Sequence, residues 1–495
     1  MKKLLLSLAL SLWPLLGAAQ TMPVAIVGAT LIDGTGRPAV ANAVVVFHEG
    51  RILLAGPRRR VKIPQGAQII EGQGLVIAPG FIDTHNHSQS GLEKDPTATT
   101  QVAQGITTVS LGQDGNSSWP VGEYLTQAEQ TPVALNLLTF VGHATLREQV
   151  MGEDYKRAAT PAEVEKMALL AEQAMREGAF GLSSGLEYEV GKRATTEELI
   201  ALARVAGRYK GIYISHIRDE ADLAFDAFRE ILRIGREARV PVQISHIKLG
   251  TVSVWGKAKE AIALIQEARR QGQDVTADCY PYDAWHSGIR VLVPSDRHDN
   301  EQDVARGLAD VGGAQNVTIV NCAAHRDYEF KTLEAIAQEQ KTTPVAVYMH
   351  IVRDGGASVV ARSMKEDDIR AFYQQPWVMV CSDGGIGMRH PRGAGTYPRV
   401  LGRFAREWKW LKLEEAIHKM TALPAKRLGL NDRGIIRAGM KADLALFDAA
   451  KIIDRATFKE AQLLPEGMNR VFVNGLEVWR DGAVTGNKPG QVLRH

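Results

Sequence analysis

The chain has 495 residues, of which 23% are charged and 45% hydrophobic, and its formal net charge is +3. These values are typical of a globular protein and exclude a largely disordered chain. The near-neutral charge argues against a nucleic-acid-binding protein, which would carry a basic face. Three scattered cysteines exclude a disulfide-rich scaffold. The length fits several domains or one large α/β barrel with additions.

The first residues have the pattern of a secretory signal peptide. Lys2 and Lys3 precede an apolar stretch over residues 4–16, and small residues follow it up to Ala19. The stretch is shorter than the ~20 residues that span a bilayer, and no cysteine stands at the cleavage point to carry a lipid. We therefore expect residues 1–19 to be a signal peptide, the mature protein to be periplasmic or secreted, and no stable membrane anchoring.

Both ends of the mature chain are rich in short strands. Residues 20–75 contain β-branched, apolar stretches separated by turn residues, and residues 428–495 have the same texture. Chain termini often lie close together in folded domains. The sequence therefore predicts that the two ends build one small β-sandwich domain.

The middle of the chain, residues 76–427, alternates short apolar strands with helices. Capping motifs mark helix starts, for example Thr160-Pro161-Ala162-Glu163. Eight strands that alternate with helices predict a (β/α)8 barrel of the TIM type. The seventh and eighth strands are too far apart for an ordinary crossover, so we expect an insert at about residues 285–376. The strands are expected at residues 75–82, 105–111, 133–140, 179–184, 211–216, 240–246, 274–279 and 377–381.

Histidines and aspartates follow the ends of these strands. A lone His-x-His, such as the one after the first strand, is a weak signal, but further polar residues follow four other strands. The active sites of such barrels lie at the C-terminal ends of the strands, so these side chains are expected to converge there. Four histidines with two aspartates fit a metal site, best for Zn²⁺, although Mn²⁺, Fe²⁺ or Ni²⁺ also accept such ligands. The predicted ligands are His85, His87, Asp114, His216, His246 and Asp383.

Several motifs carry a family resemblance. Residues 79–87, PGFIDTHNH, resemble the first-strand signature of the amidohydrolase superfamily. Residues 141–147, 177–186, 279–282 and 390–402 resemble motifs of the N-acyl-D-amino-acid deacylases (the D-aminoacylases), in the same order along the chain. The resemblance covers nearly the whole mature chain and implies a metal-dependent hydrolase.

The family pattern implies a role for each predicted ligand. His216 and His246 match the tight zinc ligands, and the His-x-His pair matches the ligands of a second, weaker metal position. Asp383 matches the catalytic aspartate. One position departs from the pattern, because Asp114 stands where the D-aminoacylases have a cysteine. A carboxylate can bind or bridge metal ions as a thiolate does, but it is a harder ligand, so the choice between one and two metal ions stays open.

The resemblance also implies which residues meet a small-molecule substrate. Lys248, Arg392 and, from the Tyr-Pro-Tyr segment, Tyr282 match residues that hold the α-carboxylate of the substrate. Arginine suits a bidentate carboxylate contact, and lysine supplies a point charge. His143, at the end of the third strand, and Ser287, at the start of the insert, are further candidates for the substrate pocket.

The expected reaction is hydrolysis of the amide bond of an N-acyl-D-amino acid to a carboxylate and a free D-amino acid. A metal-activated water would attack the amide, and Asp383 would carry its proton to the leaving nitrogen. The preference for the D enantiomer follows from the resemblance alone.

Two alternatives stay open. Hydrolases of cyclic amides or dipeptides (dihydroorotase-like, hydantoinase-like or dipeptidase) commonly use a carboxylated lysine near the fourth strand, and residues 181–187 contain no lysine. A non-catalytic exported binding protein would lack a metal ligand or Asp383, and this chain has them all. Both observations favour the deacylase.

Overall fold

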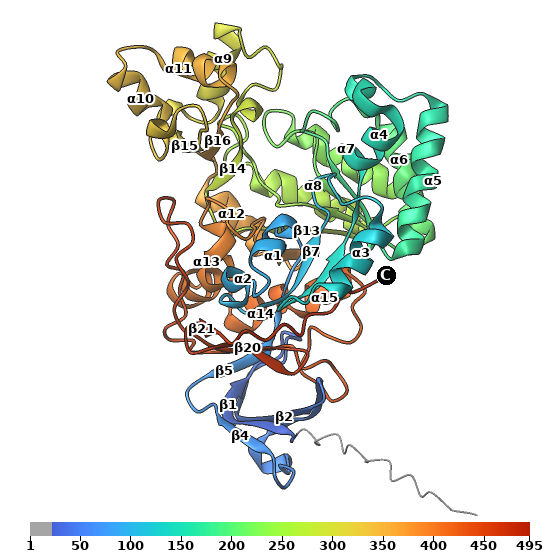
Figure 1. The fold of residues 1–495 in the computed structure, drawn as a ribbon, viewed down its shortest axis with the longest axis vertical. Helices are drawn as coiled ribbons and strands as arrows, with labels where there is room; N and C mark the ends of the chain where they lie inside the picture. The colour runs from blue at the N-terminus through green and yellow to red at the C-terminus, as the bar shows by residue number, and fades with distance from the viewer. Residues whose placement is uncertain (1–21) are drawn as a thin grey trace, which may run out of the picture.

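The computed structural model describes residues 22–495, and the predicted signal peptide lies outside the described residues. Three parts follow one another along the longest axis of the molecule (Figure 1): a β domain, a barrel and an insert. Within residues 22–495, no helix combines the length and the apolar character needed to cross a membrane.

Parallel strands form the barrel, which confirms the predicted fold class. One sheet has the order β6-β7-β8 and the other β9-β10-β11-β12-β13-β17. Beyond the strand ends, the amide of His87 donates to the carbonyl of Gly384, and the amide of Asp383 donates to the carbonyl of His85. These bonds join the first strand to the last. The strands are β6 (Phe81–Asp83), β7 (Ile106–Leu111), β8 (Asn136–Thr139), β9 (Val141–Gly142), β10 (Gly181–Gly185), β11 (Ile212–His216), β12 (Val242–Ile244), β13 (Val275–Cys279) and β17 (Val378–Val380).

Two of the predicted strands are interrupted. The strand expected over residues 75–82 divides at Gly80, so that β5 (Val76–Pro79) belongs to the β domain and β6 to the barrel. A Cβ at Gly80 would collide with the side chain of Thr107, so only glycine fits at this crossing. The third strand breaks at Phe140, where β8 pairs with β7 and β9 pairs with β10.

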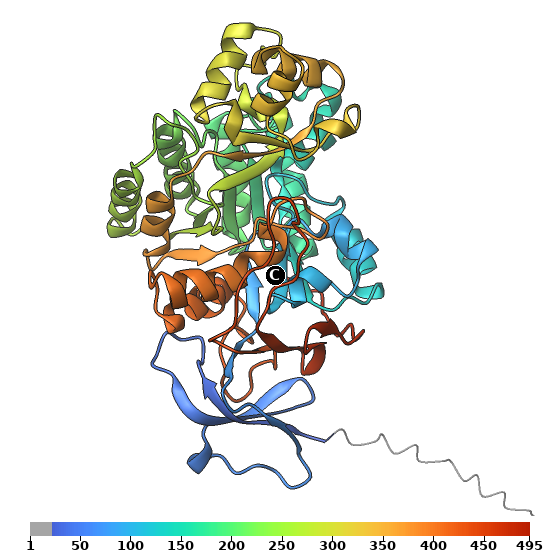
Figure 2. The same ribbon diagram turned by 90° about the vertical axis from the view of Figure 1, so that its left-hand side faces the viewer.

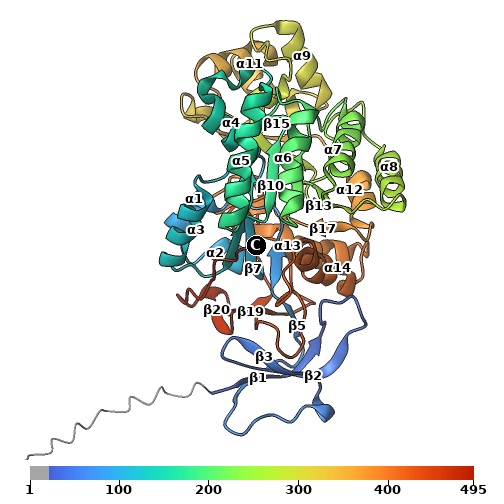
Figure 3. The ribbon, with the colours of Figure 1, turned by 90° about the vertical axis from the view of Figure 1, so that its right-hand side faces the viewer.

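Helices cover the outside of the barrel (Figure 3). At the start of α5 the predicted capping box is present, because Thr160 Oγ1 accepts from the amide of Glu163 and the Glu163 carboxylate accepts from the amide of Thr160. Each long helix turns an apolar stripe toward the strands. The helices are α1 (Gln89–Lys94), α2 (Thr99–Val102), α3 (Val121–Gln130), α4 (His143–Met151), α5 (Pro161–Glu177), α6 (Thr196–Arg208), α7 (Ala224–Ala238), α8 (Ala258–Arg270), α12 (Glu366–Tyr373), α13 (Arg392–Arg399), α14 (Leu413–Met420) and α15 (Ala422–Arg427).

Strands from both ends of the chain form one nine-stranded sheet (Figure 2). β5 pairs in parallel with β1 and antiparallel with β18, so it joins the N-terminal and C-terminal strands. Phe47 and Phe472 lie on strands that are not neighbours, yet their ring centroids are 5.2 Å apart. The sheet therefore bends over itself and packs face to face, as a sandwich does. Its other strands are β1 (Val24–Leu31), β2 (Val40–His48), β3 (Arg51–Pro57), β4 (Gln68–Glu71), β18 (Leu444–Phe447), β19 (Met468–Val473), β20 (Leu476–Arg480) and β21 (Ala483–Val484).

The insert is a small α/β unit with its own core. A three-stranded antiparallel sheet in the order β14-β16-β15 carries helices, and apolar side chains such as Ile319 and Tyr348 form a cluster separate from the barrel core. The insert ends at β16, earlier than predicted, because α12 packs on α8 and β13 of the barrel. Its elements are β14 (Ala284–Gly288), α9 (Glu301–Asp310), β15 (Val317–Asn321), α10 (Leu333–Glu339), α11 (Pro344–Arg353) and β16 (Ser358–Arg362).

Candidate metal centre and active site

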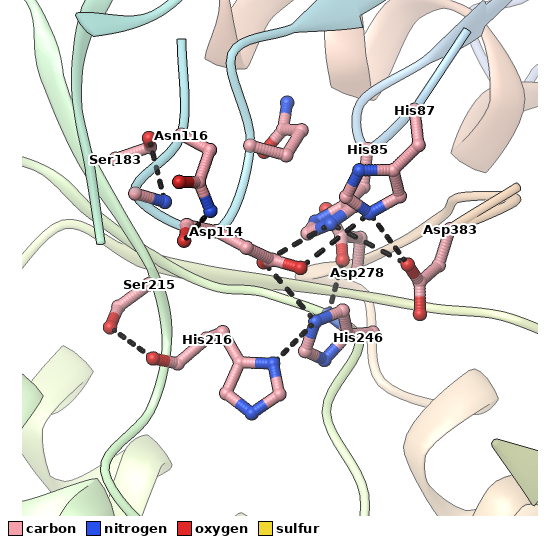
Figure 4. A network of polar contacts seen from close by, with 12 residues as sticks. His85, His87, Asp114, Asn116, Ser183, Ser215, His216, His246, Asp278 and Asp383 are labelled. Atoms are coloured by element: carbon pink, nitrogen blue, oxygen red, sulfur yellow. Dashed lines mark hydrogen bonds and ion pairs between the residues drawn. The ribbon is translucent and has the colours of Figure 1, made fainter. Parts of the chain in front are cut away.

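All six predicted ligands meet at the C-terminal ends of the barrel strands (Figure 4). One is the last residue of β11, and the others stand in the turns after β6, β7, β12 and β17. Parallel strands of a barrel end at the same rim, so residues far apart in the sequence come together there. The residues are His85, His87, Asp114, His216, His246 and Asp383.

Three of the six have left-handed backbone angles. φ is +54° at Asp114, +35° at His246 and +46° at Asp383. A non-glycine residue in this region costs roughly 1–3 kcal/mol, and such residues cluster at functional sites. Neighbouring groups hold two of these turns: the amide of His246 donates to Asp278 Oδ1, and the amide of Asp383 donates to the carbonyl of His85. The strained turns aim these side chains at a common centre.

The first ligand group consists of His216, His246 and Asp114. His216 Nδ1 lies 3.2 Å from His246 Nε2, so two ring nitrogens face one another. Asp114 Oδ1 lies 3.5 Å from His246 Nε2. Two nitrogens that face each other need a proton or a cation between them, and a buried carboxylate beside them favours a cation.

The second group consists of His85, His87 and Asp383, together with the same Asp114. His85 Nε2 lies 3.3 Å from Asp114 Oδ1, and His87 Nε2 lies 3.5 Å from Asp114 Oδ2. His87 Nε2 is also 3.2 Å from Asp383 Oδ1. Asp114 therefore lies between the two groups and belongs to both.

The spacing of these atoms is that of ligands around an ion. Two atoms each about 2.0–2.1 Å from a tetrahedral zinc ion lie roughly 3.3 Å apart, and the separations here are 3.2–3.5 Å. Within the described residues, both ring nitrogens of His85 and Oδ1 of Asp114 are buried without a hydrogen-bond partner, which is costly for polar atoms. The residues therefore fit one or two divalent metal ions.

Two glutamates that sequence reasoning missed hold the histidines of the first group. His216 Nε2 lies 2.7 Å from Glu187 Oε2, and His246 Nδ1 lies 3.0 Å from Glu220 Oε1. A carboxylate on the second ring nitrogen fixes the orientation of a metal-binding imidazole. The glutamates leave His216 Nδ1 and His246 Nε2 to face the centre. Glu187 follows the fourth strand, and Glu220 stands four residues after His216. These two positions in the sequence could have identified them as candidates.

Lys248 lines the cavity over the ligands, but its ammonium group already has partners. Nζ lies 2.6 and 2.7 Å from the two carboxylate oxygens of Glu220 and 2.7 Å from His246 Nδ1. A substrate carboxylate at this position would therefore share the ammonium group with Glu220.

Asp383 is held at its second oxygen by Arg392. Asp383 Oδ2 lies 2.8 Å from Arg392 Nη1, which leaves Oδ1 to face the histidines. Burial alone would raise the pKa of Asp383, but the positive charges of Arg392 and His246 outweigh burial and hold this pKa well below its usual range. Asp383 is therefore an ionised proton acceptor at neutral pH.

A cavity of about 660 Å³ lies over the ligands and contains most of the predicted substrate contacts. Lys248, Ser287 and Arg392 line it. Two tyrosines, Tyr188 and Tyr280, line it as well, and the buried hydroxyl of Tyr280 has no hydrogen-bond partner among the described residues. The Tyr280 ring lies 4.8 Å from the guanidinium carbon of Arg392.

The structure corrects two of the predicted substrate contacts. Tyr282 turns away from the cavity, donates from its hydroxyl to the carbonyl of Pro391 and lines a separate pocket. His143 is the first residue of α4 and is fully buried, with Nε2 2.9 Å from Glu198 Oε1. Glu198 also pairs with Arg147. His143 therefore belongs to a buried structural ion-pair network rather than to the cavity.

Known proteins are similar to this chain in sequence and in fold. The amidohydrolase family model matches residues 68–485. D-aminoacylase of Alcaligenes xylosoxydans xylosoxydans is 35% identical over 96% of this chain and 98% of its own length, and N-acyl-D-aspartate deacylase of the same organism is 37% identical over 94% of each. The crystal structure of N-acyl-D-glutamate deacylase from Bordetella bronchiseptica, complexed with zinc and a phosphonate mimic of the tetrahedral intermediate, has a TM-score of 0.86 and 32% identity over 95% of this chain and 99% of that one.

These matches confirm the resemblance seen in the sequence motifs. They extend over the barrel, the insert and most of the β domain, and their identity exceeds 30% along nearly the whole chain. The chain therefore belongs to the amidohydrolase family, among the N-acyl-D-amino-acid deacylases.

Proposed function

We propose that this protein hydrolyses the amide bond of N-acyl-D-amino acids to a carboxylate and a free D-amino acid. The observation that carries the proposal is the meeting of two metal-ligand groups, an ionised Asp383 and two cations in one cavity. The relatives named D-aminoacylase and N-acyl-D-aspartate deacylase support the substrate class.

The two ligand groups would hold zinc, the ion named with the relative from Bordetella bronchiseptica. Bound zinc supplies a water molecule with a pKa of about 7 and polarises the amide carbonyl. Asp383 Oδ1 takes up the proton of the attacking water, because Oδ2 is tied to Arg392. The same carboxyl then gives the proton to the leaving nitrogen.

The α-carboxylate of the substrate would be bound by the polar groups around Arg392. Arg392 is buried, and its Nε has no hydrogen-bond partner among the described residues, so a donor remains free. The Tyr280 hydroxyl is free in the same sense, and Lys248 adds a positive charge. We therefore assign the carboxylate contact to Arg392, Tyr280 and Lys248.

The side chain of the substrate would be neutral and apolar. The insert lines the cavity mainly with apolar side chains. Burial, and then the charge of Arg392, lowers the pKa of His286 to about 4, so this lining histidine is neutral at pH 7. Among the described lining residues, a second substrate carboxylate finds no cation other than Lys248 and Arg392, and Asp310 would repel it. The apolar lining residues of the insert are Trp285, Val291, Leu292, Pro294 and Val311.

A cyclic-amide hydrolase with a carboxylated lysine is disfavoured by the fourth strand. β10 carries no lysine, and its Ser183 hydroxyl bonds the carbonyl of Gly112. Export to the periplasm or the medium remains our proposal from the N-terminal sequence pattern, and it would suit an enzyme that scavenges acylated amino acids.

Release of free amine from paired N-acetyl-D- and N-acetyl-L-amino acids tests the proposal, with protein of measured zinc content. We expect zinc-dependent release from N-acetyl-D-methionine and N-acetyl-D-leucine, with N-acetyl-D-aspartate and N-acetyl-D-glutamate slower. Equal rates on the L series would contradict the proposed stereochemistry. Release from dipeptides or hydantoins alone would move the assignment to the alternative hydrolases.

A further inference from the structure

A second cluster of metal-binding side chains lies on the insert, among residues that do not line the cavity. His350 and Asp354 belong to the C-terminal end of α11, and His325 stands in the loop between β15 and α10. His325 Nε2 lies 2.7 Å from Asp354 Oδ2, and His350 Nε2 lies 3.5 Å from the same oxygen. One nitrogen from each histidine therefore converges on one carboxylate.

The local structure brings the three side chains together and orients one of them. His350 and Asp354 are four residues apart, which places them on the same face at the helix end. The His325 ring stacks on Tyr328, with ring centroids 4.7 Å apart and an interplanar angle of 16°. All three side chains are half-buried or partly exposed, so a hydrated ion can reach them.

The spacing requires little movement to hold an ion. Two ligands of a tetrahedral zinc ion lie about 3.3 Å apart, and the two nitrogen–oxygen separations here are 2.7 and 3.5 Å. Two imidazoles and a carboxylate are a donor set that suits zinc, copper and nickel, and water can complete the coordination. Calcium and magnesium prefer sites made of oxygen alone.

We propose that His325, His350 and Asp354 form a second, independent binding site for a divalent transition-metal ion. Such an ion ties the loop after β15 to the end of α11. The same loop carries Glu329, which pairs with Arg389, three residues before Arg392 of the active site. The ion would therefore bind on the side of the insert where Glu329 meets Arg389, outside the cavity. This site needs neither the proposed reaction nor the barrel ligands.

Zinc titration by calorimetry tests the site, with untagged enzyme that carries zinc in the barrel and has been freed of loose metal by gel filtration. We expect one additional equivalent of zinc to bind. His350→Ala and Asp354→Asn should each abolish it, with the barrel zinc content and the rate of amine release unchanged. His298→Ala is the matched control, because His298 is another insert histidine and bonds Tyr348 instead.

Two outcomes would overturn the proposal. One is the absence of any additional equivalent in the unaltered enzyme. The other is an additional equivalent that survives His350→Ala, because zinc would then occupy the second barrel position or a scattered surface histidine. A variant is shown to have folded if it retains zinc in the barrel and if its circular dichroism spectrum matches that of the unaltered enzyme. A failure of the deacylase assay leaves this result untouched, so the two proposals are tested separately.

Discussion

The two ligand groups that share Asp114 differ in how their side chains are held. In the first group, the outer ring nitrogens of His216 and His246 have carboxylate partners in Glu187 and Glu220. In the second group, both ring nitrogens of His85 lack a hydrogen-bond partner among the described residues. The side chain of His87 is 34% exposed, whereas that of His246 is 2% exposed.

This difference indicates two separate functions, retention of the metal ion and catalysis. Carboxylate partners fix imidazole orientation before a metal arrives and strengthen its binding, so the first group is built to retain an ion. The second group contains Asp383, the proposed proton acceptor, which pairs with Arg392 beside the Tyr280 ring. Because Asp383 is the proposed proton acceptor, the second group is the side on which the chemistry takes place.

The largest effect should come from the second group. Asp383→Asn removes the proton acceptor but keeps the size of the side chain, so we expect kcat to fall by about 10²–10⁴-fold. Zinc content should stay near that of the unaltered enzyme, because the first group is intact. Measurement of kcat alongside metal analysis checks this, and loss of zinc together with activity would mean that the two functions are not separated.

An intermediate effect should come from the first group. Glu187→Gln weakens the hold on His216, and the affinity for zinc should fall by about 10–100-fold. Activity should return at saturating zinc. The control is Glu189→Gln, because Glu189 is an exposed neighbour that pairs with Lys156. A kcat that stays low at saturating zinc would give Glu187 a part in the chemistry.

The smallest effect concerns the substrate contact. Tyr280→Phe removes one hydrogen bond to the α-carboxylate, worth about 1.5–3 kcal/mol for a charged partner, so KM should rise by about tenfold or more. Tyr282→Phe is the matched control and should leave KM unchanged, because its hydroxyl bonds Pro391. If Tyr282→Phe alone raised KM, the contact with the α-carboxylate would belong to Tyr282, as the sequence predicted.

The fold and the ligands were predictable because they follow from short-range patterns. Strand and helix periodicity gave the barrel, and polar residues after strand ends, such as His216 and Asp383, gave the ligands. The barrel rim brings such residues together whatever their separation in the sequence.

The direction of a side chain after the end of a strand could not be predicted from the sequence. Period-two alternation stops where the strand stops, so Tyr280 and Tyr282 could not be distinguished until the turn was known. Likewise, His143 is the first residue of α4 and pairs with Glu198 of α6. No spacing in the sequence predicts this contact between two helices. The partners Glu187 and Glu220 depend on distances between loops in the same way.

The most direct test of the account is a zinc titration of metal-free enzyme. Zinc binding and the release of D-methionine from N-acetyl-D-methionine are measured in parallel at each zinc concentration. The account predicts that activity appears as the tight site fills. His216→Ala should lose both tight binding and activity, and His87→Ala should keep tight binding. Tight zinc binding that survives His216→Ala, or amine release without metal, would contradict the account.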